Sequence, residues 1–194
     1  MPDSRLDPRL DPRPDPGPRP EPDQGAGVHI KAIPVRRWFA LAIAIVIADQ
    51  ATKWAASAVL CCQAPIAVTP FFNLVLAHNT GAAFSFLAGE PGWQRWFFAA
   101  IALIASTVIS VLLVRHAKDA AQRRFCAGLA LILGGAVGNL IDRVLYGHVV
   151  DFLDFYISGW HWPAFNVADS AISIGAALLV WDSFRSEADV KPAA

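Results

Sequence analysis

The stretch WFFAAIALIASTVISVLLV, from Trp96 to Val114, decides the fold class because it contains no charged residue. A helix rises about 1.5 Å per residue, so a stretch of this length can cross about 30 Å of hydrocarbon. An equally long helix on the surface of a soluble protein would need a charged outer face, which makes a soluble helical protein the weaker interpretation. The stretch therefore predicts a membrane-spanning helix.

Composition and three further apolar stretches extend this prediction to the whole chain. The sequence is 55% hydrophobic and 16% charged, whereas an average soluble domain is about a quarter charged. We expect an all-α polytopic membrane protein with four transmembrane helices at about 38–59, 96–114, 125–141 and 164–181. The net charge is zero, so the balance of charges gives no reason to expect a nucleic-acid partner.

The two ends of the chain are expected to lie outside this membrane domain. Residues 1–35 repeat Pro, Asp and Arg with little to bury, which predicts a disordered cytoplasmic tail. Residues 36–185 form the predicted four-helix membrane domain, and residues 186–194 form a second cytoplasmic tail.

The positions of the basic residues predict the orientation. They precede the first span, join the second span to the third, and follow the fourth: Lys31, Arg36, Arg37, Arg115, Lys118, Arg123, Arg124, Arg185 and Lys191. Because basic residues favour the cytoplasmic side, we expect both termini in the cytoplasm and the connections at about 60–95 and 142–163 outside it.

The first outer connection is long enough to fold. Its segment Ile66 to Ala77 has β-branched and aromatic residues around a proline. This pattern predicts a small β-containing extracytoplasmic segment between the first and second helices. The wider segment 63–92 is expected to form a platform and a lid, with a turn at Glu90, Pro91 and Gly92.

Polar residues in or beside the apolar spans are expensive and therefore informative. Counted from the cytoplasmic ends at about 1.5 Å per residue, they lie at similar depths of about 18 to 26 Å: Asp49, Lys53, Asn139, Asp142 and Asp169. This shared depth predicts one polar pocket in the outer half of the membrane.

Two of the acidic residues, Asp151 and Asp169, have no adjacent cation. Two carboxylates in a poorly solvated site tend to share one proton, so one can accept a proton from water while the other donates a proton. These are the two functions that peptide hydrolysis needs, and they require no cofactor. By contrast, Asp49 has Lys53 and Asp142 has Arg143 close by, which leaves open a structural role in helix packing.

Other catalytic patterns are weaker. The sequence has no GxSxG, HExxH or GxGxxG motif. The histidines His29, His78, His116, His148 and His161 lack metal-ligand spacing, so no metal is predicted. Ser85 and Ser170 have no convincing base in the sequence, which leaves a serine nucleophile as a minor alternative.

Five sequence blocks, in order, resemble the signal peptidase II family, the lipoprotein signal peptidases of bacterial inner membranes. The blocks run over residues 49–53 (DQATK), 79–84 (NTGAAF), 138–143 (GNLIDR), 149–152 (VVDF) and 165–170 (FNVADS). The resemblance covers about residues 36 to 185.

The resemblance implies an intramembrane aspartic endopeptidase that removes the signal peptide of a diacylglyceryl-modified prolipoprotein, cutting before the lipidated cysteine. Asp151 and Asp169 resemble the catalytic pair, with Asp142 as the rival for membership. The expected supporting or substrate-binding residues are Asp49, Lys53, Asn79, Gly81, Asn139, Asp142, Arg143, Asn166 and Ala168. The other expected partners are membrane lipids, an oligomer is not required, and the active site is expected towards the periplasmic face.

Gly134, Gly135 and Gly138 are expected to let helices or substrate approach closely.

The competing functions are a non-enzymatic transporter or proton relay, which would also concentrate intramembrane acidic residues, and a scaffold that binds lipoproteins. Against transport, no comparable acidic series continues to the cytoplasmic face and no inverted repeat is evident.

Overall fold

The computed structural model describes residues 32–61, 64–81 and 92–190, with side chains as far as Arg185. The elements follow in the order α1 Val35–Leu60, β1 Ile66–Thr69, β2 Phe72–Asn79, α2 Trp93–His116, η2 Ala120–Gln122, α3 Arg123–Leu145, β3 Val149–Ile157, β4 Trp160–His161 and α4 Val167–Val190. The predicted turn at Glu90 and Pro91, most of the predicted tails and part of the predicted lid lie outside the described residues.

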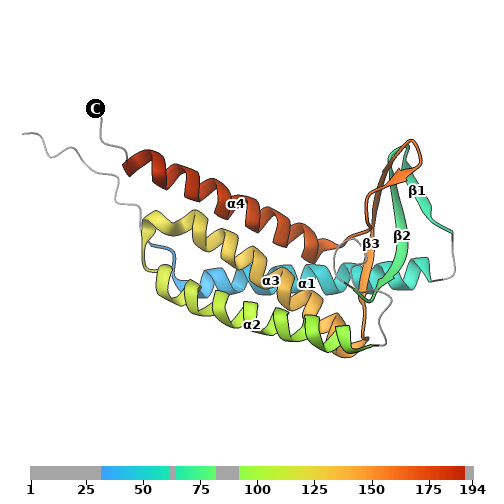
Figure 1. Ribbon diagram of the computed structural model, residues 1–194, viewed down its shortest axis with the longest axis horizontal. Coiled ribbons are helices and arrows are strands. Elements are labelled where there is room, and N and C mark those ends of the chain that lie inside the picture. The colour runs from blue at the N-terminus through green and yellow to red at the C-terminus, as the bar shows by residue number, and fades with distance from the viewer. Residues whose placement is uncertain (1–31, 62–63, 82–91, 191–194) are drawn as a thin grey trace, which may run out of the picture. The chain divides into compact units, whose positions relative to one another are not determined.

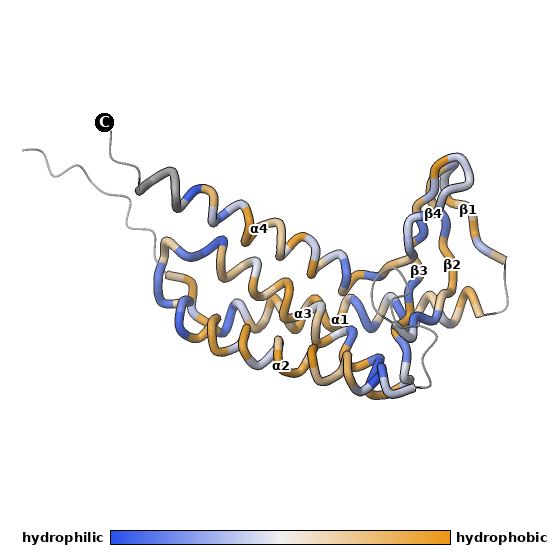
Figure 2. The backbone as a smooth tube through the Cα atoms, viewed as in Figure 1, coloured by the Kyte–Doolittle hydropathy of each residue, from blue (hydrophilic) through white to orange (hydrophobic). Residues whose placement is uncertain are grey.

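Four helices are long and apolar enough to cross a membrane, as the sequence predicts. Their bounds differ from the expected ones. The third helix continues to Leu145 rather than ending at Ile141, so Asp142 and Arg143 lie within the helix. The fourth begins at Val167 rather than Ala164, because Asn166 caps it. Along the chain, orange apolar residues dominate the four helices in Figure 2, and blue polar residues recur where the helices meet the strands.

Helix α3 is the centre of the helical bundle. In the most apolar stretch of the span that contains α3, 61% is buried inside the protein, against 17% in the corresponding stretch of each of the other three spans. Small residues allow the close contacts: a Cβ added to Gly134 would lie 2.7 Å from the carbonyl oxygen of Ala42 in α1, and one added to Gly128 would lie 2.8 Å from that of Gly175 in α4. The expectation that glycines allow helices to approach closely therefore agrees with the packing on two sides of α3.

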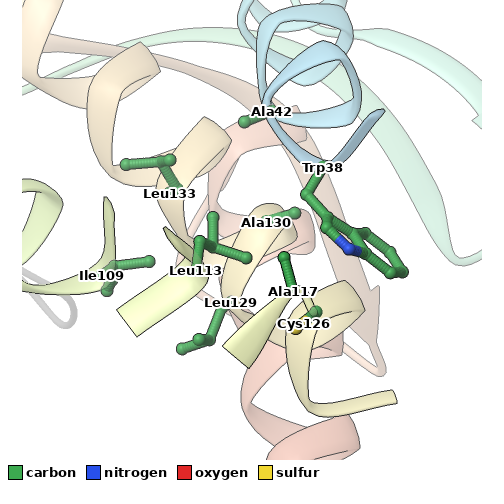
Figure 3. Close-up of a cluster of buried hydrophobic side chains, with 9 residues drawn as sticks. All are labelled: Trp38, Ala42, Ile109, Leu113, Ala117, Cys126, Leu129, Ala130 and Leu133. Carbon is green, nitrogen blue, oxygen red and sulfur yellow. The ribbon is translucent and has the colours of Figure 1, made fainter. Parts of the chain in front are cut away.

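A cluster of buried apolar side chains joins α1, α2 and α3 near the ends of the helices that lie away from the strands. Figure 3 shows Trp38 and Ala42 of α1 facing Leu113 of α2 and Ala130 and Leu133 of α3. Leu113 and Ala130 are fully buried. This part of the bundle contributes packing rather than chemistry, because its side chains are apolar.

The strands form one antiparallel sheet in the order β1-β2-β3-β4, at one end of the helices (Figure 1). The expected strands between α1 and α2 are present as β1 and β2. The sheet also contains β3 and β4, which come from the connection between α3 and α4 and were not predicted. Ser158 and Gly159 both have positive φ in the two-residue turn that joins these strands, which is the geometry of a tight hairpin.

The pairing of β2 with β3 brings distant sequence blocks together. Ala77 is opposite Asp151, and Asn79 is opposite Val149. The sheet therefore places Asn79 next to Asp151, at the point where the strands meet the C-terminal end of α3 and the N-terminal end of α4.

Candidate functional site

A cavity of about 760 Å³ lies where the sheet meets α3 and α4. Its polar lining includes Asp151, Asp169, Asn79, Asn139 and Arg143. Its wall continues along the apolar side chains Ile172 and Ile174 of α4. The cavity can therefore hold a ligand that is polar at one end and apolar along its length.

The first turn of α4 positions Asp169 through a capping box. The side-chain oxygen of Asn166 accepts a hydrogen bond from the Asp169 backbone N–H at 2.9 Å. In return, the Asp169 carboxylate accepts one from the Asn166 backbone N–H at 3.3 Å. These reciprocal bonds fix the Asp169 side chain, and the positive end of the helix dipole favours its negative charge.

Asp151 lies on β3 and is 2% exposed. Its two carboxylate oxygens accept hydrogen bonds from the side chains of Asn166, at 2.7 Å, and Asn79, at 3.1 Å. Burial and the nearby charge of Asp169 raise the pKa of Asp151 from 3.8 to about 7. Asp151 therefore holds a proton at a pH where an ordinary aspartate would be ionised.

Asn139 connects Asp169 to Lys53. Its side-chain amide donates to Asp169 Oδ1 at 2.8 Å, while its oxygen accepts from Lys53 Nζ at 2.9 Å and from Asn166 Nδ2 at 3.2 Å. Because a lysine can only donate, the Lys53 contact fixes which end of the Asn139 amide faces Asp169. Lys53 thus acts on the acidic pair through Asn139.

The charge of Lys53 is balanced by two buried carboxylates. Its Nζ lies 2.8 Å from Asp49 and 2.9 Å from Asp142, and all three side chains are nearly inaccessible. Asp49 also accepts from the Ala168 backbone N–H at 2.9 Å, in the turn that carries Asp169. This cluster ties α1, α3 and α4 together immediately beneath the acidic pair.

In the described part of the chain, Asp142 forms its salt bridge with Lys53 rather than with the neighbouring Arg143. Adjacent residues on a helix point in different directions, so Asp142 faces Lys53, whereas Arg143 donates to the carbonyl oxygens of Asn139, at 3.2 Å, and Gly81, at 3.1 Å. Gly81 in turn donates its N–H to the Asn79 side chain at 3.0 Å. Within the described part of the chain, no cation forms a salt bridge with Asp151 or Asp169.

All the expected site residues therefore belong to one connected cluster, but they do not all reach the cavity. Asp151, Asp169, Asn79, Asn139 and Arg143 line it. The others lie behind these residues: Asp49, Lys53, Asp142, Asn166 and Ala168 are buried at or below 3% exposure. Gly81 is buried between Asn79 and Arg143.

Gln50 is a site residue that the sequence analysis did not single out. Its side-chain amide donates to Asp142 Oδ1 at 2.8 Å and to the Gly138 carbonyl at 3.2 Å. In the sequence, Gln50 could have been recognised from its place beside Asp49 in the block DQATK. A long side chain next to a residue that faces another helix can still reach that helix.

The remaining histidines and serines have other contacts. The ring centroids of His78, which lines the cavity, and His148 lie 4.3 Å apart. Burial and the nearby His78 lower the pKa of His148. His161 of β4 contacts Asp154 of β3 at 2.9 Å. Ser170 donates its hydroxyl to the Asn166 carbonyl at 2.9 Å, whereas Ser85 and His29 lie outside the described residues. In the described ranges no group of three potential ligands could hold a metal ion.

Gly135 sets the distance between α3 and the turn that carries Asp169. A Cβ at this position would collide with the carbonyl oxygen of Ala168 and lie 2.7 Å from Ile172 Cγ1. We expect Gly135→Ala to push the start of α4 away from α3. The overpacking costs about 1–3 kcal/mol, and a shift of about 1 Å in Asp169 reduces any reaction at the acidic pair by roughly a hundredfold.

Gly175→Ala is the matched control for this prediction. It crowds the same two helices, because its Cβ would lie 2.6 Å from the Gly128 carbonyl oxygen, but it lies six residues beyond Asp169. Thermal unfolding should show similar destabilisation for both variants, with activity lost in Gly135→Ala alone. Equal activity in the two variants would contradict the positioning role of Gly135.

Comparison with known families gives a match over most of the chain. The family model described as signal peptidase (SPase) II matches residues 41–185. A lipoprotein signal peptidase of Paraburkholderia phymatum is 57% identical over 148 residues, which is 76% of this chain and 87% of that protein. A lipoprotein signal peptidase of Janthinobacterium sp. (strain Marseille) is also 57% identical over 148 residues, covering 88% of that protein.

Solved structures match the fold as well. A structure described as a bacterial membrane enzyme, solved in meso at 2.3 Å resolution, has a TM-score of 0.73 and 31% identity, covering 84% of this chain and 97% of that one. A second bacterial membrane enzyme structure, at 1.9 Å, has a TM-score of 0.67 and 32% identity, covering 78% of this chain and 94% of that one. The arrangement of helices and strands described above is therefore shared with membrane enzymes.

Proposed function

The chain belongs to the signal peptidase II family of membrane peptidases, and we propose that it cuts diacylglyceryl-modified prolipoproteins before the lipidated cysteine, with Asp151 and Asp169 activating water. The family supports processing of prolipoprotein signal peptides. The aspartic mechanism and the form of the substrate are the proposal, and they rest on the geometry of the acidic pair.

One observation carries the proposal: a single residue, Asn166, hydrogen-bonds both carboxylates. Its side-chain amide donates to Asp151 at 2.7 Å and its backbone N–H donates to Asp169 at 3.3 Å. Both carboxylates line one cavity. This arrangement holds the two acidic groups close enough to interact electrostatically, because the charge of Asp169 contributes to the raised pKa of Asp151.

The two carboxylates take different roles in the proposed reaction. Asp151, which retains its proton up to a pH of about 7, donates to the carbonyl oxygen of the scissile peptide. Asp169, ionised at the positive end of α4, accepts a proton from the attacking water. Asp169 then gives this proton to the departing cysteine nitrogen as the C–N bond breaks, while Asp151 regains a proton from a hydroxyl of the tetrahedral intermediate, so both acids return to their starting states.

The surrounding polar residues are proposed to orient this pair rather than to react. Asn79, Asn139 and Asn166 donate hydrogen bonds to its oxygens. Asp142 is assigned a supporting role, because it is paired with Lys53 and accepts the backbone N–H of Val150 at 3.2 Å. This last contact anchors β3 one residue before Asp151.

The shape of the cavity suits a substrate anchored in the membrane. Its acidic end lies at the start of α4, and Ile172 and Ile174 extend the wall along that helix. A lipidated precursor can thus approach sideways and present its scissile bond without moving its acyl chains into water. We place this end at the periplasmic face of the bacterial inner membrane, because Arg36, Arg115 and Arg123 lie at the opposite helix ends.

The test of the proposed function is cleavage of a diacylglyceryl-modified precursor by the purified full chain in detergent, with no ion gradient. We expect a product that begins at the lipidated cysteine, and little cleavage of the same precursor without the lipid. Ion flux in vesicles without cleavage would support the transporter instead, and binding without turnover would support the scaffold.

The raised pKa of Asp151 predicts how activity and stability depend on pH. Activity should fall as the pH rises through about 7, because Asp151 loses the proton that it donates. The pKa of Asp151 is higher in the folded protein than in the unfolded chain, so folding favours the protonated form. The contribution of Asp151 to the free energy of unfolding is therefore fully present below pH 3.8 and is lost as the pH rises through about 7.

Thermal unfolding of Asp151→Asn over the same pH range isolates this contribution. The variant cannot titrate at position 151, so its stability should fall less than that of the unchanged chain between these pH values. An identical pH dependence in both proteins would contradict the assignment of the proton to Asp151.

A further inference from the structure

A second cavity, of about 480 Å³, lies between α1 and α2, where these helices diverge over α3. It shares no lining residue with the cavity of the acidic pair. The residues that matter here come from all three helices: Phe39 and Ile43 of α1, Thr107, Ser110 and Val111 of α2, and Gly134 of α3. We call this cavity the α1–α2 groove.

The α1–α2 groove offers an apolar surface although three hydroxyl groups line it. Thr107 and Ser110 donate their hydroxyls to the carbonyl oxygens of Leu103, at 2.9 Å, and Ser106, at 2.8 Å, in their own helix. Their carbon atoms remain for contact with an occupant. The Ser106 hydroxyl is buried and has no hydrogen-bond partner in the described part of the chain. An apolar occupant is therefore favoured along most of the groove.

Two arginines lie beyond one end of the groove, on the helix faces that form its walls. Arg36 precedes Phe39 by three residues and Ile43 by seven, and Arg115 follows Val111 by four, so each lies on the face of its lining neighbours. Both arginines are exposed, and neither makes an ion pair within the described ranges. From Arg36 to Val46 the wall extends for about 15 Å.

The dimensions favour an acyl chain over a helix. A helix is about 10 Å across with its side chains, so a 10 Å length of one would displace roughly 800 Å³. The groove has about 480 Å³. A single hydrocarbon chain is narrower and can lie against α3 at Gly134.

We propose that the α1–α2 groove binds one acyl chain of an anionic phospholipid whose phosphate lies between Arg36 and Arg115. In the orientation proposed above, this lipid belongs to the cytoplasmic leaflet. Basic groups at helix ends on this side are suited to anionic headgroups. The site is independent of the acidic pair, so its failure would leave the proposed peptidase untouched.

Native mass spectrometry of the full chain, in detergent with phosphatidylglycerol or phosphatidylcholine, tests the proposal. The unchanged chain should retain one phosphatidylglycerol in preference to phosphatidylcholine. Arg36→Gln combined with Arg115→Gln should weaken phosphatidylglycerol binding roughly 30-fold. The matched control, Arg123→Gln with Arg185→Gln, removes the same charge from exposed positions in α3 and α4, away from the groove, and should bind normally.

A second pair of variants tests the acyl part of the site. Thr107→Phe fills the groove and should abolish retention of either lipid, whereas Val108→Phe adds the same ring at a neighbouring exposed position outside the groove lining and should not. Cleavage of a lipidated precursor in detergent should be unchanged in all four variants.

Two results would overturn the proposal. The first is equal retention of both lipids that neither Thr107→Phe nor the double arginine variant reduces. The second is a dimer or a bound protein that is lost in Ser106→Ala, because a helix partner would use the unpaired Ser106 hydroxyl, whereas an acyl chain would not.

Discussion

Asp151→Asn and Asp169→Asn are each expected to reduce cleavage of a lipidated precursor about a thousandfold or more, with the protein still folded and inserted. Asparagine keeps the size of the side chain and one of the two oxygens that accept hydrogen bonds from the Asn79, Asn139 and Asn166 amides. It cannot exchange a proton with water or with the peptide. Turnover in detergent and thermal unfolding, measured on the same preparations, separate the two effects.

Asp154→Asn is the matched control for the acidic pair. Asp154 is also buried on β3, three residues beyond Asp151, but its carboxylate contacts Asn73, at 3.1 Å, and His161, at 2.9 Å, rather than the cavity. This variant should retain cleavage within a fewfold of the unchanged chain. Normal turnover in either Asp151→Asn or Asp169→Asn would remove that residue from the catalytic assignment.

Lys53→Met is expected to have the largest effect on stability. It leaves the carboxylates of Asp49 and Asp142 buried without the cation that lies within 2.9 Å of both. Removing one partner from a buried charged cluster costs about 3–5 kcal/mol. Cleavage should fall as well, because Asn139 loses the donor that fixes its orientation towards Asp169. Thermal unfolding and turnover in detergent measure the two losses.

A compensated variant distinguishes lost charge balance from lost packing. Lys53→Met combined with Asp49→Asn and Asp142→Asn has no unpaired charge, and the amide introduced at position 49 still offers an oxygen acceptor to the Ala168 N–H. Much of the stability should return, whereas activity should stay low because Asn139 still lacks its lysine contact. A triple variant less stable than Lys53→Met would contradict the electrostatic explanation.

The membrane fold and the convergence of the polar residues were predictable from the sequence. The charge-free stretch from Trp96 to Val114 favours a membrane span over the surface helix of a soluble protein. Counting residues from the helix ends brings Asp49, Asn139 and Asp169 to a similar depth. In the structure, Asn139 donates a hydrogen bond to Asp169, and Lys53 contacts both Asn139 and Asp49. Asp49 also accepts a hydrogen bond from the backbone N–H of Ala168, the residue before Asp169.

Strand β3 was not predicted because the residues around Asp151 were interpreted only as a motif beside a span. The segment Val149–Ile157 contains mostly β-branched, aromatic and other apolar residues, which is a strand pattern. Its pairing with β2 depends on a contact between residues about 70 positions apart, such as Asn79 with Asp151, which are 72 apart. Local sequence cannot specify such a partner.

The partner of Asp142 could not be identified from sequence neighbours. Arg143 is adjacent in the chain, yet side chains one residue apart on a helix diverge, so the choice depended on which helix packs against each face. Helix α1 supplies Lys53 to Asp142, and the β2 end supplies the Gly81 carbonyl to Arg143. Only the packing of the elements around α3 decides between these contacts.

The most direct test of the shared-proton site is the infrared absorption of protonated carboxyl groups in the purified protein. The unchanged chain should show a protonated carboxyl below a pH of about 7 that disappears as the pH rises through this value. That signal should be absent in Asp151→Asn and remain in Asp154→Asn. A spectrum in which Asp151→Asn retains the signal, or in which the unchanged chain never shows it, would contradict the proposed mechanism.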